Sequence, residues 1–204
     1  MWDSIEKIPR VQIELTNYCN ARCNMCEREQ VHNGDIEGVH LNNRFLTLKE
    51  IEKAFSGDWN ILSKVAFIGN VDEPTINPEI FEIIEFFQKK FRGRNLMTIA
   101  TNGGARDEEF WSKMGKVASE HKGHFSVVFG IDGLEDTNHL YRKNVKWDIL
   151  QRNFRAYVSA GGIADWQFIP FSWNEHQIDD AREFAKKEGF SQFTILGSIR
   201  GEKA

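Results

Sequence analysis

Residues 16–28 read T-N-Y-C-N-A-R-C-N-M-C-E-R and include the only three cysteines of the chain, Cys19, Cys23 and Cys26. Three cysteines cannot all pair with one another as disulfides. On one short loop, however, three thiolates can hold three corners of a metal cluster and leave the fourth metal site for a different ligand. The first functional hypothesis for this sequence is therefore a metal cluster with one metal site open to another ligand.

The overall composition predicts a single domain over residues 1–204. A chain of 204 residues with 41% hydrophobic content is long enough for one well-buried core and short for two. The net charge of -4, from 26 basic and 30 acidic residues, indicates neither a nucleic-acid nor a membrane-surface partner. No apolar run approaches the ~20 residues that span a bilayer, and the first ten residues lack a secretory pattern. We therefore expect a cytoplasmic protein, in which clustered cysteines more often bind metal than form disulfides.

Predicted strands alternate with predicted helices along the whole chain. Strands are expected over residues 11–15, 64–68, 96–100, 125–131, 165–170 and 193–196. Helices are expected over residues 47–55, 77–91, 107–120, 148–160 and 174–188, and residues 30–45 are expected to form a loop. The strand at 125–131 is apolar enough for burial on both faces. This alternation predicts parallel pairing through right-handed crossovers, with the helices outside the sheet.

Short sequence signals place several helix ends. Thr47 with Glu50 has the sequence of a capping box, and Asn77 precedes a proline suited to the first turn of a helix. Gly161 follows a helix at the position where a left-handed residue is common. Asn174 stands where a side chain can cap the next helix. These signals support the predicted α/β class.

The C-x3-C-x2-C spacing directly after a strand resembles the signature of the radical S-adenosylmethionine (radical SAM) superfamily. This resemblance implies a [4Fe-4S] cluster held by Cys19, Cys23 and Cys26, with S-adenosylmethionine (SAM) chelating the fourth iron through its amino and carboxylate groups. Reduction of the cluster then cleaves SAM to methionine and a 5'-deoxyadenosyl radical, which abstracts hydrogen from a substrate. Met25 occupies the position at which family members usually place an apolar side chain against the adenine.

A zinc site is the alternative explanation of the same cysteines. Zinc accepts three cysteines and one histidine, and His32 or His40 follows the triplet closely enough to serve. With such a zinc site, or with an iron-sulfur cluster that does not react with SAM, the chain is a non-enzymatic metal-binding or redox module. A fourth protein ligand is the feature that favours this alternative.

Two further segments resemble parts of the radical SAM cavity, and each follows a predicted strand. The first is Gly69-Asn70-Val71-Asp72-Glu73-Pro74, which is similar to the loop that receives the amino group of SAM. It departs from the family pattern at Val71-Asp72, so that either Asp72 or Glu73 faces the ligand. The second is Thr101-Asn102-Gly103, whose counterpart lines the same cavity. Each segment alone is ordinary turn sequence, and its position after a strand gives it significance.

The segment after the fourth strand resembles a motif of peptide- and protein-modifying members of the family. It reads Gly130-Ile131-Asp132-Gly133 and continues to His139 and Arg142, whereas the family pattern begins with serine. The resemblance assigns Asp132 and Arg142 to SAM, with the Arg142 guanidinium on the SAM carboxylate, a pairing suited to bidentate contact. Because Gly130 replaces the serine, one contact to the ribose must be lost or supplied elsewhere. Three polar residues near the fifth strand, Gln167, Asn174 and His176, are further candidates for the cavity.

The resemblance covers residues 10–196 and implies a partial (β/α)6 TIM-like barrel of parallel strands with outer helices. In such folds the site lies at the carboxyl ends of the strands. The expected partners are a reductant such as flavodoxin or ferredoxin and a peptide, protein or small-molecule substrate. The chain has no further cysteines for the auxiliary clusters of relatives with a SPASM domain. We therefore expect either an enzyme with one cluster or a fragment of a longer enzyme, and no residue is assigned to the chemistry after hydrogen abstraction.

Overall fold

Six parallel strands form one sheet in the order in which they occur along the chain. The computed structural model describes residues 8–36, 41, 44–69, 71–91, 96–121 and 123–197. The strands are β1 (Arg10–Gln12), β2 (Lys64–Phe67), β3 (Leu96–Thr101), β4 (Phe125–Gly130), β5 (Ile163–Phe168) and β6 (Gln192–Ile195). This order confirms the predicted partial barrel of parallel strands with outer helices.

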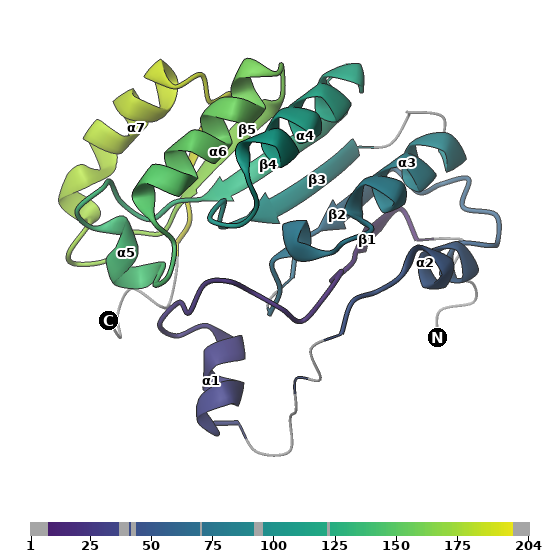
Figure 1. Cartoon of the computed structure of the whole chain (residues 1–204), viewed down its shortest axis with the longest axis horizontal. Helices are drawn as coiled ribbons and strands as arrows, with labels where there is room; N and C mark the ends of the chain where they lie inside the picture. Colours follow the sequence, from purple (N-terminus) through teal and green to yellow (C-terminus); the bar gives the residue numbers. More distant parts are fainter. Residues whose placement is uncertain are drawn as a thin grey trace.

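The helices are distributed unequally about the sheet. They are α1 (Glu27–Asn33), α2 (Leu48–Ala54), α3 (Ile80–Lys90), α4 (Glu108–Glu120), α5 (Asn138–Tyr141), α6 (Trp147–Ser159) and α7 (Ile178–Lys187), with short 3-10 turns η2 (Pro74–Ile76) and η3 (Glu175–Gln177). Figure 1 shows α3, α4, α6 and α7 along one face of the sheet, with α1 beyond the opposite side. None of the helices that the structure describes has the length and hydrophobicity needed to cross a bilayer.

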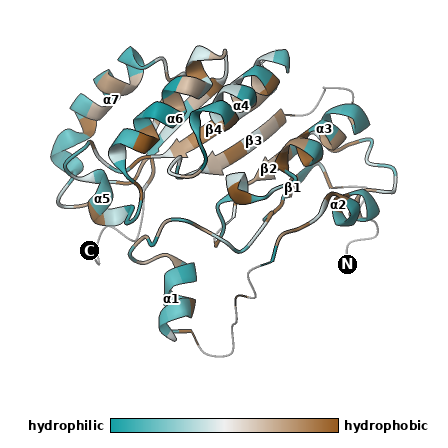
Figure 2. Cartoon of the chain, in the orientation of Figure 1, coloured by the Kyte–Doolittle hydropathy of each residue, from teal (hydrophilic) through white to brown (hydrophobic). Residues whose placement is uncertain are grey.

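The main core lies between the sheet and its helices, and Figure 2 shows the apolar residues gathered on the strands. Phe129 of β4 packs against Trp111 of α4 with ring centroids 5.2 Å apart, and Tyr157 of α6 lies 6.2 Å from Trp111. The alternate residues of β4 are only partly buried, and Val128 and Gly130 line a cavity on the other face. The prediction that this strand is buried on both faces was therefore wrong, because the inner face of an open barrel is only partly covered.

Helix α1 occupies part of the segment that was expected to be a loop. Its carboxyl end is capped by Gly34 at φ 80°, and the N–H of Asp35 donates to the carbonyl of Gln30 at 2.8 Å. The Asn33-Gly34 pair therefore ends a helix instead of forming an isolated turn. The four-residue helix α5 was also not predicted, since so short a helix leaves no periodic pattern.

Most of the predicted caps are confirmed. The capping box between Thr47 and Glu50 forms in both directions, and Gly161 has φ 90° after α6. Asn77 accepts from the N–H of Glu79 at 2.8 Å, although α3 begins only at Ile80. Asn174 does not cap a helix; its side chain instead bonds backbone groups of the loops after β4 and β5.

Candidate functional site

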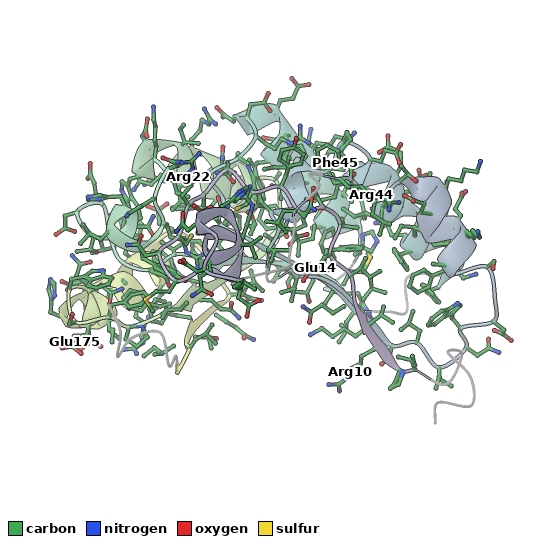
Figure 3. All side chains as sticks on the ribbon, turned by 90° about the horizontal axis from the view of Figure 1, so that it is seen from below. Arg10, Glu14, Arg22, Arg44, Phe45 and Glu175 are labelled. Carbon is green, nitrogen blue, oxygen red and sulfur yellow. The ribbon has the colours of Figure 1, made fainter. Side chains whose placement is uncertain are left out.

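The chain leaves the sheet after β1 and is fixed by side chains from other loops before it reaches the cysteines. The N–H of Leu15 donates to Asp72 Oδ2 at 3.0 Å, and the carbonyl of Leu15 accepts from Asn77 Nδ2 at 2.8 Å. Thr16 forms an isolated bridge with Phe45. Figure 3 shows this face from below, with Glu14 between β1 and the loop that carries Arg22. The cysteine loop therefore begins from a fixed point at the carboxyl end of β1.

All three thiols line one cavity of about 300 Å³, and none of them forms a disulfide. Cys23 is buried, whereas Cys19 and Cys26 are half-buried. Burial, followed by the nearby Glu73 carboxylate, raises the pKa of the Cys19 thiol to about 12. Burial also raises the pKa of Cys23, against the opposing effect of Arg142. Metal binding at these residues would therefore displace protons from buried thiols.

The donor geometry fits a multi-iron cluster better than a single zinc ion. In the part of the chain that the structure describes, no three His, Cys, Asp or Glu side chains converge on one metal position. Zinc draws every ligand to about 2.0–2.3 Å, whereas each thiolate of an iron-sulfur cluster binds a different iron. His32 is exposed on α1 and does not line the cavity, and His40 lies outside the described residues. The described cavity thus offers three thiols and no histidine.

Asp72 lies on the cavity wall with one carboxylate oxygen unused. Its Oδ2 accepts from Leu15, while its buried Oδ1 has no hydrogen-bond partner. The carboxylate lies over Gly69, where a Cβ atom would come within 1.9 Å of Oδ1. Burial, with smaller contributions from Glu73 and Glu14, raises the pKa of Asp72 to about 7. A buried carboxylate oxygen without a donor is rare in folded proteins and indicates a missing partner.

Glu73 has the opposite arrangement, because protein donors already surround it. Its Oε1 accepts from the hydroxyls of Thr75 and Thr101 at 2.6 and 2.7 Å, and its Oε2 accepts from the N–H of Asn102 at 2.8 Å. The side chain is 1% exposed, and this burial raises its pKa. Glu73 therefore joins the loops after β2 and β3.

Asn102 has its side-chain amide directed at the cysteine loop. Its Nδ2 donates to Asn20 Oδ1 at 2.8 Å and to Cys19 Sγ at 3.5 Å, and its Oδ1 accepts from the N–H of Gly104 at 2.8 Å. Asn20 was not singled out in the sequence. Its place directly after a cysteine was the only signal, and that gives no indication of a partner 82 residues away.

Arg142 lines the same cavity and forms an ion pair with Asp132. The Nε of Arg142 donates to Asp132 Oδ2 at 2.7 Å, with the two side chains 19% and 0% exposed. Burial lowers the pKa of Arg142, but Asp132 and Cys23 outweigh it and the net shift is upward. A Cβ atom at Gly130 would lie 2.6 Å from Arg142 Nη2, so the guanidinium occupies the space in which a serine side chain would begin.

The remaining candidates divide into those near the cavity and those away from it. Gln167 lines the cavity, as does Tyr141 of the segment between Asp132 and Arg142. Met25 adopts a left-handed backbone at φ 64° and is not among the residues that line the cavity. Asn174 bonds the carbonyl of Asp132 and thus supports the wall from behind. Asn70 lies outside the described residues.

A family model described as the radical SAM superfamily matches residues 13–185, which is most of the chain. The chain belongs to the radical SAM superfamily. This superfamily consists of enzymes that use a [4Fe-4S] cluster and SAM. Membership therefore weighs against the non-enzymatic metal-binding module that the cysteines alone allowed.

One sequence relative and two solved structures are similar to this radical SAM chain. A protein of Pyrococcus furiosus named "tungsten-containing aldehyde ferredoxin oxidoreductase cofactor-modifying protein" is 29% identical over 122 residues, which is 60% of this chain and 30% of that protein. The structure of anSMEcpe with bound AdoMet matches 92% of this chain and 50% of that one, with a TM-score of 0.70 and 20% identity. Streptococcus suis SuiB bound to S-adenosylmethionine matches 95% and 42%, with a TM-score of 0.67 and 15% identity.

The similarity to the two solved structures shows that the chain shares their fold. The chain spans half or less of the length of each of these relatives.

Proposed function

We propose that the chain is a radical SAM enzyme that binds a [4Fe-4S] cluster through Cys19, Cys23 and Cys26, and binds SAM in the adjoining cavity. When bound, these cofactors supply reductive cleavage of SAM and a 5'-deoxyadenosyl radical that abstracts hydrogen from a substrate. The observation that carries the proposal is that one cavity, lined by the thiols, is also lined by Asp72, which has an unused carboxylate oxygen, and by the half-buried guanidinium of Arg142. The amino acid end of SAM carries an ammonium group and a carboxylate, which pair with a protein carboxylate and a guanidinium respectively.

Arg142 is the proposed partner of the SAM carboxylate. Its Nε is held by Asp132, so the side chain is fixed before any ligand arrives. The ends of the guanidinium lie beside Gly130 on the cavity wall, where they can donate two parallel hydrogen bonds. Asp132 is thus assigned to positioning Arg142 and not to SAM itself.

Asp72 is the proposed partner of the SAM ammonium group. Of the two adjacent carboxylates, Asp72 alone has an oxygen without a hydrogen-bond donor, since four protein donors already bond to Glu73. An ammonium group beside Oδ1 would satisfy this oxygen and favour the ionised carboxylate. Glu73 is accordingly assigned to holding the cavity wall. Contacts of Met25 with the adenine and of Asn70 with SAM remain predictions.

The proposed substrate is a peptide or protein, and the proposed electron donor is flavodoxin or ferredoxin. The substrate class is supported by the motif from Asp132 to Arg142 and by solved structures with similar folds. These include anSMEcpe with bound AdoMet and a peptide, and SuiB bound to its precursor peptide. The Pyrococcus furiosus relative, named as cofactor-modifying, supports a small-molecule substrate instead. We further propose one core domain over residues 1–204 and a cytoplasmic location.

Anaerobic reconstitution with iron and sulfide, followed by incubation with SAM and dithionite, tests the proposed function. We expect iron-sulfur absorbance and release of 5'-deoxyadenosine. Cys19→Ala, Cys23→Ala and Cys26→Ala should each abolish that product, whereas Arg155→Ala on the surface of α6 should not affect it. Cluster formation without 5'-deoxyadenosine, or activity that survives loss of any one cysteine, would contradict the proposal.

A further inference from the structure

The side chains of Asn20 and Asn102 form a cyclic pair of amides beside the first cysteine. The Nδ2 of Asn102 donates to Asn20 Oδ1 at 2.8 Å, and the Nδ2 of Asn20 donates to Asn102 Oδ1 at 3.2 Å. One hydrogen of the Asn102 amide is used in this ring. The other is directed at Cys19 Sγ, which lies 3.5 Å away, a separation suited to the larger sulfur atom.

The backbone around Asn102 fixes which end of its amide faces the sulfur. The N–H of Gly104 donates to Asn102 Oδ1 at 2.8 Å, so the oxygen is held toward the turn and the nitrogen toward the cysteine loop. The backbone N–H of Asn102 donates to the buried Glu73 carboxylate. With only 5% of the residue exposed, the side chain has little room to reorient. All hydrogen-bonding positions of the amide are thereby used within the protein.

A purely structural role explains only part of this arrangement. The bond from Gly104 to Oδ1 is an ordinary turn interaction of asparagine. It does not account for a second asparagine, 82 residues away in sequence, that closes a ring on the same amide. Nor does it account for a donor directed at one of three thiols in a shared cavity.

We propose that Asn102 is a positioning residue that donates a hydrogen bond to Cys19 when Cys19 holds the cluster, and so makes the bound cluster easier to reduce. This inference rests on the proposed function. Reduction adds one electron from the reductant, and Asn102 exchanges neither electron nor proton. A hydrogen bond to a cluster sulfur stabilises the added negative charge and raises the reduction potential. The bond opposes burial and the nearby Glu73 carboxylate, which both disfavour negative charge at Cys19.

A potentiometric titration of the reconstituted chain, without SAM and followed by its visible and electron paramagnetic resonance spectra, tests the proposal. Asn102→Leu keeps the approximate volume of the side chain and removes the donor. At a fixed applied potential, we expect the ratio of reduced to oxidised cluster to fall about tenfold, the factor that corresponds to the net free energy of one hydrogen bond to a charged group. For a one-electron couple this corresponds to about 59 mV.

Two further variants separate the hydrogen bond from simple loop stability. Asn20→Ala leaves the donor but removes the partner that orients it, and should shift the ratio in the same direction by a smaller factor. Asn153→Ala is the matched control, because Asn153 Nδ2 holds the same loop through the carbonyls of Gly103 and Ala105 at 2.7 and 3.0 Å. This control should lower the free energy of unfolding without changing the potential.

The outcomes distinguish this proposal from the proposed function. An unchanged potential in Asn102→Leu, or an equal shift in Asn153→Ala, overturns the role of Asn102 and leaves the proposed function intact. If Asn102→Leu does not take up a cluster, the Asn20→Ala variant provides the test. A lowered reduction potential of its cluster would support the role of Asn102, and an unchanged potential would contradict it. Failure of the wild-type chain to bind any cluster overturns both.

Discussion

Two ionisable side chains of opposite charge reach the cavity from different loops, and each is held by the protein before a ligand binds. Asp72 is fixed through Leu15, which follows β1, while Arg142 is fixed through Asp132, which follows β4. Groups that are already oriented lose less entropy when they bind a ligand. The zwitterionic end of SAM would therefore be recognised by a pair of side chains that are oriented before it binds.

Replacement of Arg142 by alanine should weaken SAM binding by about 2–3 kcal/mol, because one partner of a buried charged contact is lost. This corresponds to a dissociation constant roughly 30- to 150-fold higher, measurable by calorimetry on the reconstituted protein. The variant should also unfold more easily, since the Asp132 carboxylate, which is 0% exposed, loses its counter-charge.

The control is Arg155→Ala, which breaks an ion pair with Glu188 in which the arginine side chain is 50% exposed. Exposed pairs of this kind contribute about 1 kcal/mol or less, and no effect on SAM is expected. Unchanged SAM affinity in Arg142→Ala would show that this residue does not contact SAM.

The carboxylate of Asp72 should make SAM binding depend on pH near neutrality. Its pKa is raised to about 7 by burial and by Glu73 and Glu14. Because an ammonium group binds the ionised form, the ratio of wild-type to Asp72→Asn affinities should rise between pH 6 and 8. In the SAM-free protein the folded state holds this proton more tightly than the unfolded state. The free energy of unfolding should therefore fall as pH rises from ~4 to ~7, and Asp72→Asn should reduce that fall.

Glu14→Gln is the matched variant for this titration. It removes one of the negative charges that raise the pKa of Asp72, so the midpoint of the affinity profile should move to lower pH. An affinity ratio that stays flat from pH 6 to 8 would show that Asp72 does not face the ammonium group.

At the site, the sequence identified the residues better than their individual roles. Asp72 and Glu73 are adjacent and chemically alike, and only the folded loop shows that Thr75 and Thr101 surround Glu73. The replacement of serine by Gly130 was evident in the sequence. The position of the Arg142 guanidinium beside Gly130 was not, because this contact joins two different elements.

At the scale of elements, the contact between α4 and α6 leaves no room for a side chain at Gly115. A Cβ atom there would lie 2.3 Å from the carbonyl oxygen of Tyr157 and 2.7 Å from Ala160 Cβ. In an exposed helix, glycine to alanine stabilises by about 1 kcal/mol. Here overpacking should reverse the sign, so Gly115→Ala should destabilise the chain by about 1 kcal/mol or more in urea unfolding.

Lys116→Ala tests the neighbouring exposed position of the same helix and should change stability by less than about 0.5 kcal/mol. A Gly115→Ala variant that is more stable than the wild type would mean that α4 and α6 can separate freely at this point.

The order of the elements could be predicted because parallel strands and crossover helices leave a strong alternating pattern. Their ends were harder to predict, and β5 shows why. A strand was expected over residues 165–170, but β5 ends at Phe168. The next N–H, that of Ile169, donates to Asp132 Oδ1 at 2.7 Å instead of to a neighbouring strand. A partner 37 residues away decides where the strand ends, and no local pattern reports it.

At the scale of the whole molecule, the cavity is assembled from the ends of successive strands. Its lining includes Cys19 after β1, Asp72 after β2, Asn102 after β3 and Arg142 after β4. A ligand that contacts all four loops should link segments that are far apart in the sequence. Its binding free energy would therefore stabilise the cavity side of the sheet more than the helices on the opposite face.

Hydrogen exchange of the reconstituted protein with and without SAM tests this coupling. At a SAM concentration 100 times the dissociation constant, amides that exchange only from the ligand-free form should slow by ~100-fold. We expect this protection at residues 16–28, 71–75, 101–104 and 130–142, and little change in α4. The Cys19→Ala protein, treated identically, should show none of it. Protection confined to a single loop would mean that SAM does not bridge the strand ends, and the cavity would then have to bind it in a different orientation.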